Sequence, residues 1–331
     1  MLASGRRAVR AGWAAVTAMT CFTLTACGSS LPRNRETLPG TYRVKMRESA
    51  AGSRRRYLVH VPAGYRTGQP LPLVVVLHGA FSSGREMELV TGFSDLADRE
   101  GFLVAYPNGI GLAGLFQHWN AGFCCAKAMR DHIDDVGFVA RVVDEVAARL
   151  AVDLTRVFLV GNSNGGMLAY RIAALRPGLV AAVAVAGASI GLQGSDADPT
   201  LRTPDPEIPV SVAIFHGRAD ANVPYQGGVG ARGGSGLLSV DDSVRFWTCH
   251  DRCAPEPTTE TLCGGAVLRQ TWSGADPRSE VVLYSIDGWG HDWPGRHFTA
   301  RLGRDHPLFG LDAAELMWQF FERQSSGTRA D

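Results

Sequence analysis

The sequence predicts an α/β fold in which a mostly parallel central sheet carries helices on both faces. Several short apolar segments have no polar alternation, which is typical of strands buried on both faces. Segments with apolar residues at helical spacing separate them, so that strand and helix alternate along the chain. There is no internal repeat and no second core, and the predicted catalytic domain spans residues 41–324.

The expected elements follow one another in a regular order. An alternating segment at 56–61 is typical of a sheet edge, and continuous apolar runs lie at 73–77, 102–106, 157–160, 180–185, 210–215 and 281–286. The expected helices span 136–150, 165–175, 240–247 and 313–321. Asp134 and Asp135 precede the first of these helices as caps.

Composition and charge argue against several classes of function. The 331 residues are 45% hydrophobic and 20% charged, with a formal net charge of +1. That balance provides no electrostatic field for attracting nucleic acid. The sequence has no phosphate loop, no HExxH helix and no dinucleotide fingerprint, so we expect neither a cofactor nor a metal.

The N-terminal residues are typical of an export signal. Three arginines precede an uncharged apolar stretch, 11–26, that is too short and too rich in threonine for a membrane span. The sequence LTAC ending at Cys27 resembles a bacterial lipobox. We therefore expect a lipoprotein signal peptide over 1–26, a lipid-anchored linker over 27–40 and a disordered tail over 325–331. The lipid on Cys27 would hold the protein in the cell envelope, at the outer face of the bacterial cell membrane; plain secretion is the alternative.

Export would place the domain in a compartment where disulfides form. Five cysteines follow Cys27, at positions 124, 125, 249, 253 and 263, and an odd number leaves at least one unpaired. Cys249, Cys253 and Cys263 are close in sequence, so we expect one local bridge among them. Their spacing, with His250, lacks the second ligand pair of a zinc site.

The candidate nucleophile is Ser163, in the run GNSNG at 161–165. An expected strand leads directly into this run and an expected helix follows it, which is the context of a nucleophile elbow. The sharp turn requires glycine on both sides of the serine, and the helix dipole favours negative charge there. A plain turn serine is the alternative. The elbow narrows the prediction to the α/β-hydrolase fold.

A serine hydroxyl needs a base, and in this fold an acid and a histidine follow the serine in that order. His291 is the expected base because it follows the last expected strand and a glycine-containing loop. Asp220 is the expected orienting acid, since it follows the strand at 210–215. Asp287 is its main rival but lies too near His291 along one loop. The other histidines after Ser163 are His216, His250, His297 and His306.

Acyl transfer also needs backbone N–H groups aimed at the developing oxyanion. We expect one from Asn164, directly after the nucleophile, and one from Ala80, in the loop after the strand at 73–77. Trp119, Trp289 and Trp293 are candidates for lining the acyl or alcohol pocket, with a place in the core as the alternative for each.

Seven segments resemble, in order, the secreted polyhydroxybutyrate depolymerase-like esterases, a group that includes feruloyl, acetylxylan and actinobacterial lipoprotein esterases. They are PLVVVLHG, GFLVAYPNG, HWNAGFCC, DDVGFVARVVD, GNSNGGMLAYRIA, HGRADANVPY and GWGHDWPG. The resemblance implies metal-free hydrolysis of carboxylic esters through Ser163, Asp220 and His291. Many members have a cysteine where this chain has Ala80, which leaves the cysteine pairing open.

The sequence therefore predicts a serine carboxylic ester hydrolase that forms an acyl-enzyme. The expected substrates are polyester or hydroxyalkanoate esters, or feruloyl and acetyl esters of plant cell walls. Two alternatives remain, an acyltransferase using the same site and a non-catalytic substrate-binding lipoprotein. We expect a monomer whose partners are the ester and, through the lipid on Cys27, a membrane, with no nucleic acid.

Overall fold

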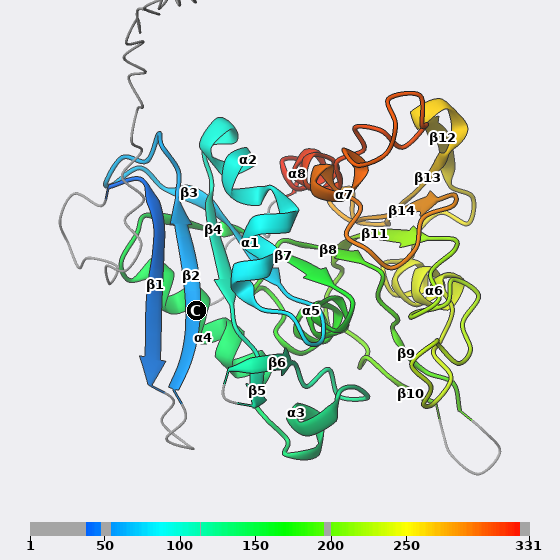
Figure 1. The fold of residues 1–331 in the computed structure, drawn as a ribbon, viewed down its shortest axis with the longest axis horizontal. Coiled ribbons are helices and arrows are strands. Elements are labelled where there is room, and N and C mark those ends of the chain that lie inside the picture. Colours follow the sequence, from blue (N-terminus) through cyan, green and yellow to red (C-terminus); the bar gives the residue numbers. More distant parts are fainter. Residues whose placement is uncertain (1–37, 48–53, 113, 195–199, 325–331) are drawn as a thin grey trace, which may run out of the picture.

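The computed structural model describes residues 38–47, 54–112, 114–194 and 200–324. A ten-stranded sheet crosses the molecule in the order β1-β2-β4-β3-β7-β8-β11-β14-β13-β12 (Figure 1). Its strands are β1 (Gly40–Arg47), β2 (Arg54–Val61), β3 (Leu71–Leu77), β4 (Leu103–Pro107), β7 (Val152–Asn162), β8 (Ala182–Ala186), β11 (Ser211–Gly217), β12 (Thr258–Leu262), β13 (Val267–Ser273) and β14 (Glu280–Ile286).

The six central strands, from β4 to β14, pair in parallel, and the strands on either side of them pair antiparallel. All the strands expected from the sequence belong to this sheet. The strands β1, β12 and β13, which lie outside the parallel centre of the sheet, were not predicted. Every residue of β12 is at least partly exposed, so this strand lacks the continuous apolar run by which central strands are recognised.

Helices cover both faces of the sheet, as the sequence predicts. They are α1 (Gly84–Thr91), α2 (Phe93–Glu100), α3 (Ala126–Arg130), α4 (Asp135–Ala147), α5 (Asn164–Leu175), α6 (Val240–His250), α7 (Arg296–Thr299) and α8 (Ala313–Phe321). Two short pairs, β5 (Ile110–Leu112) with β6 (Leu115–His118) and β9 (Gly191–Leu192) with β10 (Leu201–Arg202), lie outside the main sheet. Cys263–Gly265 forms a 3₁₀ turn.

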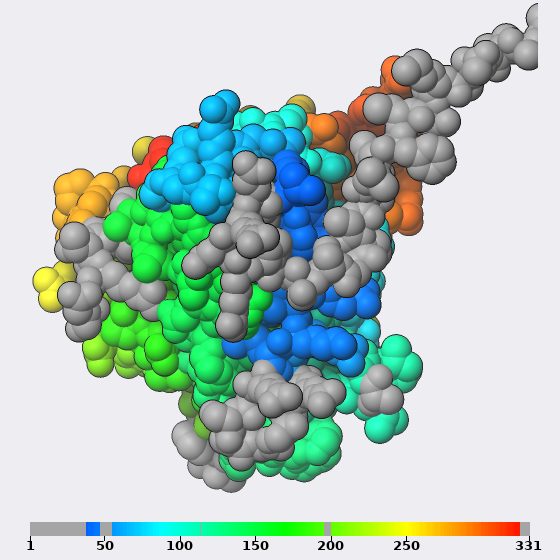
Figure 2. Space-filling model, turned by 90° about the vertical axis from the view of Figure 1, so that its left-hand side faces the viewer, coloured from blue at the N-terminus to red at the C-terminus, as the bar shows by residue number. Residues whose placement is uncertain are grey.

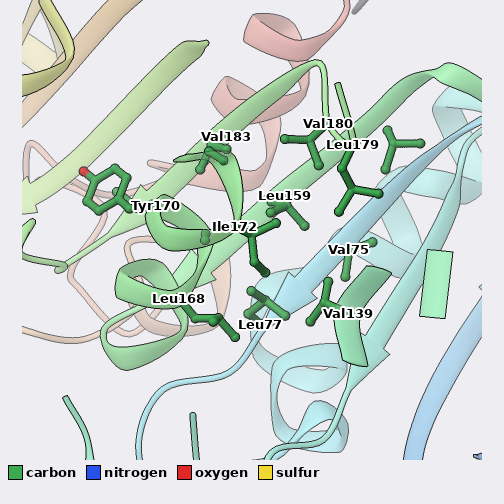
Figure 3. Packing of buried hydrophobic residues seen from close by; sticks show 14 of the residues in the cluster. Val75, Leu77, Val139, Leu159, Leu168, Tyr170, Ile172, Leu179, Val180 and Val183 are labelled. Carbon is green, nitrogen blue, oxygen red and sulfur yellow. The ribbon is translucent and has the colours of Figure 1, made fainter. Parts of the chain in front are cut away.

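Alternate residues of the central strands enter two separate cores. Val75 and Leu77 of β3 pack with α4, α5 and α6 on one face, where Leu159 and Ile172 also converge (Figure 3). Val74 and Val76 pack with α1, α2 and α8 on the other. Each central strand is thus buried on both sides, which explains its unbroken apolar run. The predicted fold class is confirmed.

The edge of the sheet at β1 lies at the molecular surface, where the blue N-terminal strands sit beside green segments from the middle of the chain (Figure 2). The predicted signal peptide, Cys27, nearly all of the linker and the C-terminal tail lie outside the described residues and stay predictions. Within the described ranges, no helix is long and apolar enough to cross a membrane.

Candidate active site

Ser163 sits in a sharp turn between β7 and α5. Its backbone has φ 51° and ψ −120°, a left-handed region that costs energy for a residue with a side chain. The flanking glycines make the turn possible. A Cβ on Gly161 would lie 2.4 Å from the carbonyl oxygen of Gly165, and a Cβ on Gly165 would lie 2.4 Å from that of Leu77. The elbow therefore packs directly against the end of β3.

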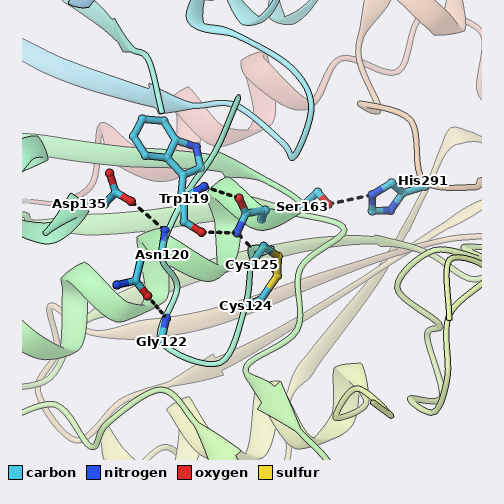
Figure 4. The surroundings of a disulfide bond; sticks show 9 residues. Trp119, Asn120, Gly122, Cys124, Cys125, Asp135, Ser163 and His291 are labelled. Atoms are coloured by element: carbon cyan, nitrogen blue, oxygen red, sulfur yellow. Dashed lines mark hydrogen bonds between the residues drawn. A yellow bond between two sulfur atoms is a disulfide. The ribbon is translucent and has the colours of Figure 1, made fainter. Parts of the chain in front are cut away.

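The ends of three central strands bring a serine, a histidine and an aspartate together. Nε2 of His291 lies 2.9 Å from Oγ of Ser163, and its Nδ1 lies 2.7 Å from Oδ2 of Asp220 (Figure 4 shows the first pair). Ser163 follows β7, Asp220 follows β11 and His291 follows β14. In the sheet these strands stand in the order β7-β8-β11-β14, all parallel, so their carboxyl ends lie at one edge of the sheet.

The Asp220 carboxylate is buried and hydrogen-bonded on both oxygens. Oδ1 accepts from the backbone N–H groups of Asn222 and Val223, at 2.8 and 2.9 Å. Nε2 of His216 lies 3.4 Å from Oδ2 and donates to the Val223 carbonyl. Burial alone would raise the pKa of Asp220, but the hydrogen bonds from His216 and His291 lower it well below the usual range.

The rival residues lie elsewhere. Asp287 is largely exposed and pairs with Arg218 on the surface. His297 contacts Arg301, and His306 accepts from the Leu308 N–H. His216 packs beside Asp220. The segment HGRAD carries both residues, so their closeness has a signal in the sequence.

The loop after β3 lies beside the elbow. Ala80 and Asn164, the expected oxyanion donors, both line the same cavity as Ser163 and His291. Among the described residues, no hydrogen bond is found for the backbone N–H of either. Both amides are therefore available to a ligand oxygen.

The cavity has a volume of about 580 Å³, within the range of small-molecule sites. Its lining includes the apolar residues Phe123, Met129, Met167, Leu192 and Leu237. The lining also includes charged residues of both signs. Arg232 lies with its guanidinium carbon 5.2 Å from the centre of the exposed Phe81 ring, while Glu86 and Asp292 supply carboxylates. The described residues contain no group of three or more His, Cys, Asp or Glu side chains suited to a metal ion.

Comparison with known sequences identifies the family. The sequence profile described as "Esterase PHB depolymerase" matches residues 55–199. "Putative esterase NocK" of Nocardia uniformis subsp. tsuyamanensis is 30% identical over 266 residues, which cover 76% of this chain and 74% of that protein. The chain belongs to the PHB depolymerase family of esterases.

Further relatives of the esterase are more distant. Feruloyl esterase C of Emericella nidulans is 25% identical, over 81% of this chain and 83% of the relative. Feruloyl esterase B of Piromyces equi is also 25% identical, but the match covers 72% of this chain and only 42% of that protein. With these relatives, the family membership identifies the protein as a carboxylic ester hydrolase.

Solved structures agree on the fold of the esterase. An acetyl xylan esterase from Aspergillus awamori superposes with a TM-score of 0.55 at 14% identity, covering 85% of this chain and 99% of that one. An S-formylglutathione hydrolase from Agrobacterium tumefaciens gives 0.53 at 13% identity, covering 88% and 98%. At such identities the likeness concerns the fold alone, and that fold is the predicted α/β-hydrolase fold.

The three tryptophans considered for the pocket of the esterase occupy different places. Trp293 lines the cavity. Trp289 does not; its indole N–H donates to the Asp292 carbonyl, and its ring belongs to the core on the α8 face of the sheet. Trp119 is fully buried behind the cavity wall, against the rings of His78 and Phe138. Both are held by contacts within the protein, so neither offers a surface to substrate.

The cysteines of the esterase pair differently from expectation. Cys124 and Cys125 form a disulfide between adjacent residues (Figure 4), and both residues line the cavity. Cys249, Cys253 and Cys263 are free, so the expected local bridge among them is wrong. Cys253 packs on the core beneath α6, whereas Cys263 packs on the core across the sheet. Nearness in sequence therefore does not bring these two thiols together. The pair CC in HWNAGFCC was the signal for the cavity disulfide.

Proposed function

We propose that the esterase cleaves its substrate by two-step acyl transfer, with Ser163 as nucleophile, His291 as base and Asp220 as orienting acid. The continuous line of hydrogen bonds from Ser163 through His291 to Asp220 is the observation that supports this. Carboxylic ester hydrolysis needs such a line because a serine hydroxyl is a weak nucleophile without an adjacent base.

In the first step, Nε2 of His291 takes the proton of Ser163 as Oγ attacks the ester carbonyl carbon. The carbonyl oxygen becomes an oxyanion, for which the Ala80 and Asn164 N–H groups are the proposed donors. His291 then gives its proton to the departing alcohol oxygen, which leaves an ester between Ser163 and the acyl group.

In the second step, water takes the place of the alcohol. Water attacks the carbonyl carbon of the acyl-enzyme while His291 accepts a proton from the water. His291 then gives that proton to Oγ of Ser163 as the acid leaves. Asp220 keeps the proton of the neutral ring on Nδ1, so that Nε2 is free to act, and it stabilises the imidazolium in both steps. The lowered pKa of Asp220 supports this role because the carboxylate stays ionised.

For substrates, we propose hydroxyalkanoate or polyester esters, or feruloyl and acetyl esters of plant cell walls. The apolar lining residues Phe123, Met167 and Leu237 support a substrate with an apolar acyl or alcohol group. The names of the feruloyl esterase relatives support the aromatic acyl group among these. Rates on a matched set of feruloyl, acetyl-sugar and short hydroxyalkanoate esters would rank the classes.

The test is the variant Ser163→Ala, assayed on p-nitrophenyl acetate and treated with a fluorophosphonate probe. We expect turnover to fall by about 10⁶-fold, as for loss of a nucleophile in a triad, and labelling of the wild type at Ser163 alone. The melting temperature should change little. Retained turnover in the variant, or labelling at another residue, would overturn the assignment.

The same assay separates the alternatives. With a competing alcohol present, a hydrolase releases mainly free acid, whereas an acyltransferase releases mainly the new ester. A binding protein without catalysis would leave Ser163 of the wild type unlabelled by the probe.

A further inference from the structure

We propose that Trp119 and the side chain of Asn164 are positioning residues that fix the two oxyanion donors relative to one another. The inference rests on the proposed function, in which the Ala80 and Asn164 N–H groups stabilise the oxyanion. These donors belong to separate segments, the loop after β3 and the first turn of α5. Stabilisation requires both to be held at hydrogen-bond distance from one oxygen atom.

The first link is a two-bond clamp between Asn164 and the backbone of Trp119. Oδ1 of Asn164 accepts from the Trp119 N–H at 2.8 Å, and Nδ2 donates to the Trp119 carbonyl at 3.1 Å. The amide thus pairs with one residue's backbone as a neighbouring strand would. Asn164 is only 2% exposed, so water does not compete for these bonds.

The second link joins Trp119 to the loop that carries Ala80. The indole N–H of Trp119 donates to the carbonyl of His78 at 2.9 Å, and the two rings lie 4.7 Å apart. His78 is two residues before Ala80. A continuous path of contacts therefore runs from one proposed donor, through Asn164 and Trp119, to the segment of the other.

The His78 ring holds the loop from the inside. The Gly109 N–H donates to Nε2 at 2.9 Å, so Nδ1 carries the proton and donates to the Gly79 carbonyl. Complete burial lowers the pKa of His78 to about 4, so the ring stays neutral and keeps this pattern of hydrogen bonds at neutral pH. Both carbonyls before Ala80 are thus occupied, which leaves the peptide that presents its N–H little freedom to rotate.

The backbone beside Trp119 is held by a buried ion pair between Arg55 and Asp135. Arg55 donates to Oδ1 of Asp135, and Oδ2 of Asp135 accepts from the N–H of Asn120, the residue after Trp119. The Arg55 guanidinium lies 3.8 Å from the centre of the Phe138 ring and 5.7 Å from that of Trp119. The group that aligns the two donors is therefore fixed to α4 and β2 and does not depend on the substrate.

The experiment compares Trp119→Phe with Trp247→Phe in the full chain. Trp119→Phe keeps an aromatic ring but loses the N–H that reaches His78. Trp247 is equally buried, and its indole N–H has no partner within the described part of the chain, so the control loses volume without losing a hydrogen bond. The readouts are kcat, KM, melting temperature and the Ki of a trifluoromethyl ketone, which binds Ser163 as a tetrahedral oxyanion.

For Trp119→Phe we expect kcat to fall by about 10- to 100-fold, less than the 100- to 1000-fold loss of a whole donor, with KM within about twofold. The Ki of the ketone should rise by the same factor as kcat/KM falls, because only the tetrahedral state uses the donors. Trp247→Phe should keep kcat and Ki within about twofold. Wild-type kcat in Trp119→Phe, or an equal loss in both variants, would overturn the proposal.

Two further variants allow the proposal to be tested even if Trp119→Phe does not fold, and separate it from the proposed function. If Trp119→Phe does not fold, a protein with β-(3-benzothienyl)alanine at position 119 keeps the bicyclic shape and lacks only the N–H; the same changes in kcat and Ki are expected, and their absence refutes the proposal. Ser163→Ala separates the two levels of inference. If it is inactive while the altered position 119 is fully active, the positioning role fails and the proposed function stands.

Discussion

The Asp220 carboxylate shows how a single residue of the site is specified by its surroundings. One oxygen faces His291 and the other accepts two backbone N–H groups of the following turn. Ion and hydrogen-bond partners hold its pKa below the unfolded value of about 3.9. The stability that it contributes is therefore present above that pH, and is lost only as the pH falls through the lower, folded value.

At this scale the sharpest prediction is Asp220→Asn. The amide can fill the same space, but it no longer favours the Nδ1–H tautomer of His291, so kcat should fall by about 10⁴-fold. Kinetics on a p-nitrophenyl ester at neutral pH give the measurement. Asp287→Asn is the matched control, because Asp287 lies in the loop with His291 but is exposed and pairs with Arg218. A larger loss in the control than in Asp220→Asn would reverse the assignment of the acid.

At the scale of elements, the approach of α5 to the end of β3 determines how near the elbow lies to the loop of Ala80. No side chain separates the two elements at Gly165, where a Cβ would lie 2.4 Å from the Leu77 oxygen and 2.5 Å from the His78 oxygen. Both obstacles are backbone atoms, so they cannot be relieved by rotating a side chain. The contact holds the turn with Ser163 beside the loop that carries Ala80, one of the proposed oxyanion donors.

We therefore expect Gly165→Ala to lower both stability and activity. Alanine favours a helix by about 0.5–1 kcal/mol over glycine, but overpacking costs about 1–3 kcal/mol, so the clash should win. The displaced elbow should reduce kcat by about tenfold or more. Urea denaturation and kinetics measure both effects. Gly303→Ala, where a Cβ meets open space, should match the wild type; an unchanged kcat in Gly165→Ala would show that the contact does not align the site.

For the whole molecule, we expect stability to depend on pH through one buried carboxylate, Asp251, which lies far from the candidate active site. Asp251 caps α6 and accepts from the N–H of Val210, just before β11, at the end of that strand opposite Asp220. Its Oδ2 is buried with no hydrogen-bond partner within the described ranges. Burial raises the pKa of Asp251 to about 7. Because the folded value lies above the unfolded one, stability is lost as the pH rises from about 4 through 7.

Asp251→Asn should remove this loss. The quantity to compare is the free energy of unfolding of the variant minus that of the wild type. This difference should be larger at pH 8 than at pH 5, by on the order of 2–4 kcal/mol. Urea denaturation at both pH values measures the difference, with the exposed Asp305→Asn as control. Esterase activity should be unaffected, because Asp251 lies at the amino-terminal end of β11 and the candidate site lies at its carboxyl end. An equal effect at both pH values would contradict the prediction.

The sequence predicts the central strands well because burial on both faces leaves an unbroken apolar run, and it fails for β12, whose residues are exposed. It predicts Ser163, Asp220 and His291 as site residues for a related reason. The carboxyl ends of parallel strands lie at one edge of the sheet, so residues that directly follow these strands come together. The clamp between Asn164 and Trp119 had no such signal. Trp119 lies in a long connection whose position depends on Arg55 and Asp135, which are 80 residues apart.

The order of the strands also determines when the site can exist during synthesis. His291 lies 128 residues after Ser163, beyond a strand that must first join the sheet next to β11. A chain still emerging from the ribosome thus carries Ser163, the proposed nucleophile, long before His291, the proposed base. Until β14 is in place, Ser163 lacks the imidazole that the proposed mechanism requires, so under that proposal a nascent chain cannot yet attack esters.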